Sequence, residues 1–111
     1  MSNSKLISYI TSDFQTKSDM KVGEVEWEKI MNKNFDKFKK AGAVRQTVTQ
    51  IWNKEGALRL GHLWEYKDEK AFVACQTLLD KYHAPKVKTF VNKVVGSRGI
   101  VLHEFAADDF K

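Results

Sequence analysis

The sequence predicts an α+β fold in which strand (β) and helix (α) segments follow one another in the order βαββαβ. Four segments alternate side chains with the two-residue period of a strand. Two others place apolar residues at steps of three and four, which is the period of a helix. A chain of 111 residues has the size of one domain with one core, so residues 1–111 are expected to form a single domain.

The first element is predicted to be a strand over residues 6–14. Its two faces both carry apolar side chains, which indicates that both faces are covered by other parts of the protein. Residues 15–23 are mostly polar and are expected to form a loop, in which Ser18 and Asp19 are suited to cap a first helical turn.

A helix is predicted over residues 25–41, because one apolar stripe runs along it, and Gly42 supplies a left-handed stop. Two strands joined as a hairpin should follow, over residues 44–52 and 57–66, with residues 53–56 as the turn. The first of these strands should place Val44, Val48 and Trp52 on one face together with Gln46 and Gln50. The second should place on one face Leu58, Leu60, His62, Trp64 and Tyr66.

The second long helix is predicted over residues 68–82, with Asp68 as its N-cap. Pro85, the only proline, cannot continue that helix without a kink, so a shorter helical piece is expected over residues 86–95. Residues 96–99 then indicate a turn and residues 100–105 a last strand, after which the tail should be loose.

Taken together, these elements predict a ferredoxin-like arrangement, with two helices on one side of a four-stranded antiparallel sheet. Apolar residues occur at both parities of the predicted strands. Large bare apolar surfaces are rare on soluble monomers, so the face without helices should also be buried. The simplest covering is a second copy of the chain related by two-fold symmetry, which predicts a homodimer.

The charge of the chain restricts its partners only weakly. Lysine and arginine exceed the acids to give a net charge of +5, and residues 81–98 are the most basic stretch. Such a surplus serves solubility or attracts an anionic partner such as nucleic acid. An RNA-recognition motif has the same element order, but the positions of its stacking aromatics fall on Gly61 and Leu63. Nucleic-acid binding is therefore the less favoured prediction.

No apolar run approaches the roughly 20 residues that cross a membrane, and the start lacks the pattern of a signal peptide. A single cysteine, Cys75, offers neither an internal disulfide nor a paired-cysteine site. We therefore expect a cytoplasmic protein with no membrane partner.

The segment from Gly61 to Phe72, which reads GHLWEYKDEKAF, resembles the dimeric α+β barrel superfamily. Its His-Leu-Trp-Glu-Tyr stretch is most similar to the NIPSNAP branch. The length also fits the antibiotic-biosynthesis-monooxygenase and EthD-like branches. The resemblance implies a homodimer in which two sheets pack into one barrel. It also implies that a ligand pocket lies between each sheet and its own helices.

The best-defined chemistry in that superfamily is haem degradation. The pattern of those enzymes has an asparagine on the first strand, a tryptophan in the second helix and an iron-binding histidine ten residues later. Aligned on Ala71 and Phe72, this chain has Cys75 and Pro85 at the two helix positions. Its first strand has no asparagine, so no haem and no other cofactor is expected.

Five residues are predicted to form the site. His62 is the candidate catalytic residue, because an imidazole on an apolar face can accept and donate a proton near neutral pH. Each candidate also has a structural interpretation, as a packed aromatic, an interior histidine or a helix-end residue. No metal site is expected, because the three histidines are far apart in sequence. The candidate substrate-binding residues are Tyr9, Trp64, Tyr82 and His83.

Three functions stay open from the sequence. The first is binding or oxidation of a small apolar or aromatic molecule, for which the resemblance implies a monooxygenase-like reaction without cofactor. The second is a non-catalytic binding or stress-response module. The third is a basic nucleic-acid-binding domain.

Overall fold

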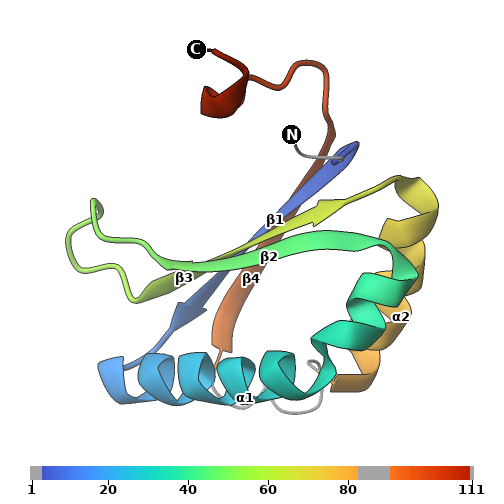
Figure 1. The fold of residues 1–111 in the computed structure, drawn as a ribbon. Helices are drawn as coiled ribbons and strands as arrows, with labels where there is room; N and C mark the ends of the chain where they lie inside the picture. Colours follow the sequence, from blue (N-terminus) through green and yellow to red (C-terminus); the bar gives the residue numbers. More distant parts are fainter. Residues whose placement is uncertain (1–3, 83–90, 111) are drawn as a thin grey trace.

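The computed structural model describes residues 4–82 and 91–110 and places two helices on one face of a four-stranded sheet (Figure 1). This arrangement confirms the ferredoxin-like α+β fold that the sequence predicts. The elements in chain order are β1 (Leu6–Phe14), α1 (Lys17–Ala41), β2 (Ala43–Gln50), β3 (Arg59–Tyr66), α2 (Glu69–Tyr82), β4 (Val91–Ile100) and the short 3₁₀ helix η1 (Ala107–Asp109).

The strand order across the sheet is β2-β3-β1-β4, and every neighbouring pair is antiparallel. Ile10 of β1 lies opposite His62 of β3 on one side and opposite Gly96 of β4 on the other. Val48 of β2 also lies opposite His62. Because side chains alternate along a strand, this register directs one set of residues toward the helices and the other toward the helix-free face.

Strand β1 and helix α2 agree closely with the prediction. Strand β1 has the predicted bounds. Helix α2 begins one residue after Asp68, whose carboxylate oxygen accepts a hydrogen bond of 2.8 Å from the backbone N–H of Ala71. Asp68 is therefore the N-cap that the sequence indicates.

Helix α1 begins at Lys17, so the loop predicted over residues 15–23 is wrong over residues 17–23. The cap is Thr16, whose hydroxyl accepts a hydrogen bond of 3.0 Å from the N–H of Asp19. Gly23 weakens the helix signal, yet its lack of a side chain has a packing reason. A Cβ at this position would lie 2.8 Å from the ring of Phe14, so the glycine lets the helix approach β1.

The hairpin has a longer connection than predicted, because β2 ends at Gln50 and β3 begins at Arg59. Trp52 lies in this connection with 87% of its surface exposed, so its predicted place within the first hairpin strand is wrong. The N–H of Ala57 donates to the carbonyl of Lys54 at 3.1 Å, which closes a turn within the loop.

The C-terminal third differs most from the prediction. Residues 91–100 form β4, so the predicted helix is wrong over 91–95, the turn over 96–99 is wrong, and the last strand ends at Ile100. Residues 86–90 of that predicted helix lie outside the described residues. Strand β4 pairs with β1 along its length, and this pairing overrides the local turn signal of Gly96 and Gly99.

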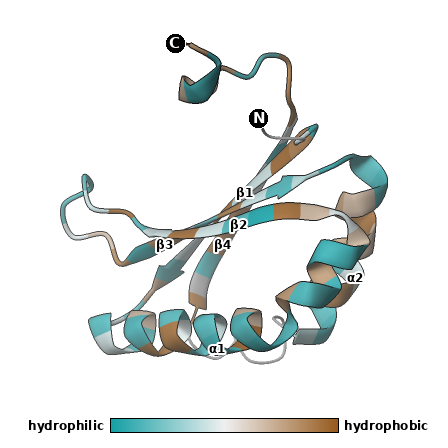
Figure 2. Ribbon diagram, in the orientation of Figure 1, coloured by the Kyte–Doolittle hydropathy of each residue, from teal (hydrophilic) through white to brown (hydrophobic). Residues whose placement is uncertain are grey.

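The core lies between the sheet and the two helices. Trp64 and Tyr66 of β3 are fully buried there with Phe38 of α1 and Cys75 of α2. Along both helices, hydrophobic residues are interspersed with hydrophilic ones (Figure 2). This pattern is expected for a helix that packs one face on a sheet and exposes the other.

We predict that Gly42→Ala destabilises the protein more than Gly56→Ala. Both glycines have positive φ, which costs other residues about 1–2 kcal/mol. A Cβ at Gly42 would also collide with Ala71 of α2, which adds about 1–3 kcal/mol, whereas Gly56 has open space around it. Urea unfolding of the two variants measures the difference. Equal losses of unfolding free energy would contradict the close packing of the α1 end against α2.

Candidate functional site

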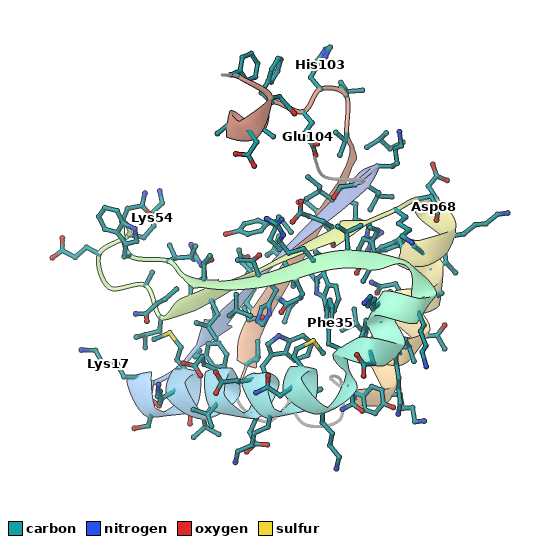
Figure 3. All side chains as sticks on the ribbon, viewed as in Figure 1. Lys17, Phe35, Lys54, Asp68, His103 and Glu104 are labelled. Carbon is teal, nitrogen blue, oxygen red and sulfur yellow. The ribbon has the colours of Figure 1, made fainter. Side chains whose placement is uncertain are left out.

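A cavity of about 150 Å³ lies between the sheet and the helices. The walls come from three strands and both helices, which pack over the inner face of the sheet. Figure 3 shows the side chains that fill the space around it, with Phe35 of α1 directed toward the sheet. The lining residues are Ile10, Trp27, His62, Trp64, Gln76, Leu79, Asp80 and Val94.

Three aromatic rings form one end of the cavity. Strand alternation places His62 and Trp64 of β3 on the helix side, and the apolar stripe of α1 places Trp27 over them. The ring centroids of Trp27 and His62 are 5.2 Å apart, and those of Trp27 and Trp64 are 6.3 Å apart. Both pairs meet edge to face, the arrangement that aromatic quadrupoles favour.

A hydrogen-bond chain connects two of these rings through Gln46 of β2. The indole Nε1–H of Trp27 donates to Oε1 of Gln46 at 3.2 Å, and Nε2 of Gln46 lies 3.4 Å from Nδ1 of His62. An indole N–H can only donate, which assigns the amide oxygen to the Trp27 side. The amide N–H therefore donates to Nδ1, and the proton of the neutral imidazole resides on Nε2.

The cavity combines apolar walls with a few polar groups, which is the usual composition of a small-molecule site. Helix α2 contributes the amide of Gln76 and the carboxylate of Asp80. Cys75 of the same helix is not a reactive group, because burial raises the pKa of its thiol to about 11 and keeps it protonated at neutral pH. The wall of this cavity therefore offers apolar surface and hydrogen-bonding groups, and no reactive thiol.

The structure brings together two of the five predicted site residues, His62 and Trp64. Tyr9 is on the opposite face of the sheet, where it lies opposite Leu63, because its neighbour Ile10 has the parity that faces the helices. Tyr82 is at the end of α2 and outside the cavity lining, where its hydroxyl accepts a hydrogen bond of 2.6 Å from Lys37. That bond lowers the pKa of the phenol. His83 lies outside the described residues.

Two important residues were missed as site residues from the sequence. Trp27 is predicted from the apolar stripe of its helix to be a core residue, with closure of a pocket mouth as the alternative, and it was not among the five predicted site residues. The sequence could have indicated Gln46. Its polar side chain lies two residues before Val48, and therefore on the same face of the strand as Val48, which is directed at the core. Its role depends on its contacts with Trp27 and His62, which come from two other elements.

The helix-free face has an apolar centre and a charged margin. Tyr9 and Leu63 lie opposite each other at the centre, with Ile7 and Val95 on neighbouring positions. Ion pairs occupy the strand ends. Arg59 donates to the carboxylate of Asp13 and thereby lowers the pKa of that group, and Arg45 lies 3.5 Å from the carboxylate of Glu65.

The residues that the structure describes show neither a metal-binding cluster nor a membrane-spanning helix. Among residues 4–82 and 91–110, no three histidine, cysteine, aspartate or glutamate side chains gather as they would around a metal ion. Neither helix in that part of the chain has the length and apolar composition needed to cross a membrane.

A family model described as Domain of unknown function (DUF6974) matches residues 3–101. The chain belongs to the DUF6974 family. No curated protein matches the sequence.

Solved structures share the fold of this DUF6974 chain. A dimeric ferredoxin-like protein from an uncultured marine organism has 27% identity and a TM-score of 0.83, over 92% of this chain and 99% of that one. A second such protein has 22% identity and a TM-score of 0.83, over 93% of this chain and 92% of that one. These matches confirm the resemblance to the dimeric α+β barrel superfamily at the level of fold.

A third similar structure is a monooxygenase of Streptomyces coelicolor in complex with the ligand nanaomycin D. It has 6% identity and a TM-score of 0.69, over 94% of this chain and 93% of that one. This similarity concerns the fold alone. None of the three structures is described as a NIPSNAP protein, so that branch stays a prediction.

We predict that Gln46→Glu changes the tautomer of His62 in this DUF6974 chain. In the native protein the amide of Gln46 donates to Nδ1, so nitrogen-15 chemical shifts should show the proton on Nε2. A carboxylate at position 46 can only accept, so the proton should move to the Nδ1 side. A native His62 that already carries its proton on Nδ1 would contradict the hydrogen-bond chain.

Proposed function

We propose that this DUF6974 chain binds a small aromatic molecule with one ring in the cavity between its sheet and helices. The observation that carries the proposal is the composition of the cavity wall. Trp27 and Trp64 offer flat apolar surfaces, while His62 offers a hydrogen-bond donor beside them. A ring with one or two oxygen substituents satisfies both kinds of surface.

The volume limits the size of the ligand. A cavity of about 150 Å³ holds a molecule of about the size of benzene. Sites for drug-sized ligands are larger, roughly 300–1,000 Å³. The size therefore favours a single ring over a multi-ring molecule or a haem.

The polar groups favour a phenol or a quinol over a charged acid. His62 and Gln76 place polar groups at the cavity wall, and the amide of Gln76 can donate to or accept from a ligand oxygen. Asp80 contributes a carboxylate, which would repel an anionic ligand and accept a hydrogen bond from a hydroxyl. A phenol or a dihydroxybenzene presents both a donor and an acceptor.

Oxidation of the bound molecule without cofactor is the second candidate function. The fold shared with the Streptomyces monooxygenase supports it. The predicted role of His62 as a proton acceptor has less support, because the contact with Gln46 favours a proton on Nε2. Binding is therefore the primary proposal.

A nucleic-acid-binding function has weaker support, since Gly61 and Leu63 occupy the positions where stacking aromatics would be needed.

The proposal includes a homodimer formed through the helix-free face. Two structures that share the fold are described as dimeric ferredoxin-like proteins. The apolar centre and charged margin of this face match the usual pattern of an interface, with an apolar core and a polar rim. A cytoplasmic location stays a prediction from the sequence.

We predict that phenol and hydroquinone quench the fluorescence of Trp27 and Trp64 in a Trp52→Phe variant. The chain has three tryptophans, and Trp52 is exposed in the loop, so this variant removes the one that does not report on the cavity. Saturable quenching at millimolar concentration or below is expected.

The matched pair of variants is Leu79→Phe and Val73→Phe, both made in the Trp52→Phe background. Leu79 lines the cavity, so a larger side chain should fill it and abolish quenching, whereas Val73 is exposed on the same helix and should have no effect. An oxygen electrode tests the second candidate. Uptake of oxygen with hydroquinone that disappears in Leu79→Phe supports oxidation. Quenching that persists in Leu79→Phe, or that does not saturate, would contradict binding in the cavity.

A further inference from the structure

The C-terminal arm, residues 101–110, exposes three large apolar side chains. Leu102, Phe105 and Phe110 have 84%, 78% and 68% of their surfaces exposed. The rings of Phe105 and Phe110 are 6.3 Å apart, so these two side chains form an apolar cluster, and Leu102 is exposed three residues before Phe105 on the same arm. Aromatic side chains of this size bury roughly 150–250 Å² each, and a contiguous exposed patch of several hundred Å² marks an interaction site.

The arm leaves the sheet at its edge strand. The N–H of Val101 donates to the carbonyl of Lys5 at 2.8 Å, which continues the pairing of β4 with the start of β1 for one more bond. Beyond that point the arm projects from the end of the sheet on the side away from α1 (Figure 1). Its labelled side chains, His103 and Glu104, stand far from both helices (Figure 3).

We propose that the arm of each subunit crosses to the second subunit of the homodimer and packs its apolar cluster on the margin of that subunit's sheet. This inference rests on the proposed dimer and extends it, because it names the segment that each copy gives to the other. The arm begins at the edge of the same sheet whose helix-free face forms the proposed interface, so the two contacts are continuous.

Charge favours a second copy as the occupant. The C-terminal residues 101–111 carry the three acids Glu104, Asp108 and Asp109 against one base, Lys111, whereas the chain as a whole has a net charge of +5. The acidic arm is therefore complementary to the basic remainder of another copy. Exposed cations on the helix-free side include Arg45 of β2 and Lys93 of β4.

The length of the arm is sufficient for the exchange. At roughly 3.3 Å per residue, residues 101–110 span up to roughly 33 Å when extended. Strands lie about 4.8 Å apart, so a four-stranded sheet is roughly 15–20 Å wide. An arm that starts at the edge of one sheet can therefore reach across a facing sheet.

Sedimentation equilibrium on the complete chain tests the exchange with a triple variant, Leu102→Ser, Phe105→Ser and Phe110→Ser. The native protein should have about twice the 12.8 kDa mass of one chain. The triple variant should raise the dimer dissociation constant by about 30-fold or more, because removal of clustered apolar anchors weakens an interface by that order. The control is Trp52→Ser, which removes an equally exposed aromatic from a distant loop and should leave the constant within about twofold.

The outcomes separate the arm from the dimer. A native monomer at micromolar concentration would contradict the dimer and the arm exchange together. A native dimer whose dissociation constant is unchanged in the triple variant would overturn the exchange and leave the dimer intact. In mixed dimers of isotope-labelled and unlabelled chains, the exchange predicts nuclear Overhauser contacts from the Phe105 ring to the other chain. Contacts confined to its own chain would show that the arm folds back and would reject the exchange.

Discussion

The register of β3 between β1 and β2 is the constraint on which the rest of the structure depends. His62 lies opposite Ile10 of β1 and Val48 of β2, and all three point toward the helices. A slip of one residue would carry His62 and Trp64 to the helix-free face and bring Leu63 under the helices. The burial of Trp64 and Tyr66 opposes such a slip, because both rings would lose their contacts with the core.

This register separates two surfaces with different chemistry. On the helix side, large aromatic residues leave a small cavity beside the imidazole of His62, whose Nδ1 lies 3.4 Å from the amide of Gln46. On the other side, smaller apolar residues alternate with threonines and ion pairs, as on a surface that another molecule covers. The proposed ligand site and the proposed dimer interface therefore lie on opposite faces of one sheet, and a change on one face need not disturb the other.

The sequence predicted most accurately the elements whose signals are local. Strand β1, the alternation of β3 and the cap of α2 at Asp68 all follow from periodicity and capping chemistry. Strand β4 did not, because its glycines indicate a turn and only pairing with β1 makes it a strand. The start of α1 was missed because Gly23 weakens the helix signal, although it is there to make room for Phe14. For the site, the two-residue spacing of His62 and Trp64 predicted that they share one face of their strand. Both faces of β1 are partly apolar, so the sequence could not decide whether Tyr9 faces the helices or the helix-free side.

The cavity is proposed to bind a single aromatic ring between Trp27 and Trp64 beside His62. Intermolecular nuclear Overhauser contacts between ring protons of bound phenol and the isotope-labelled protein test this most directly. We expect contacts to the indole protons of Trp27 and Trp64 and to the methyl groups of Leu79, because all three residues line the same cavity. Contacts to Tyr9 and Leu63 on the helix-free face, with none to the two indoles, would contradict it.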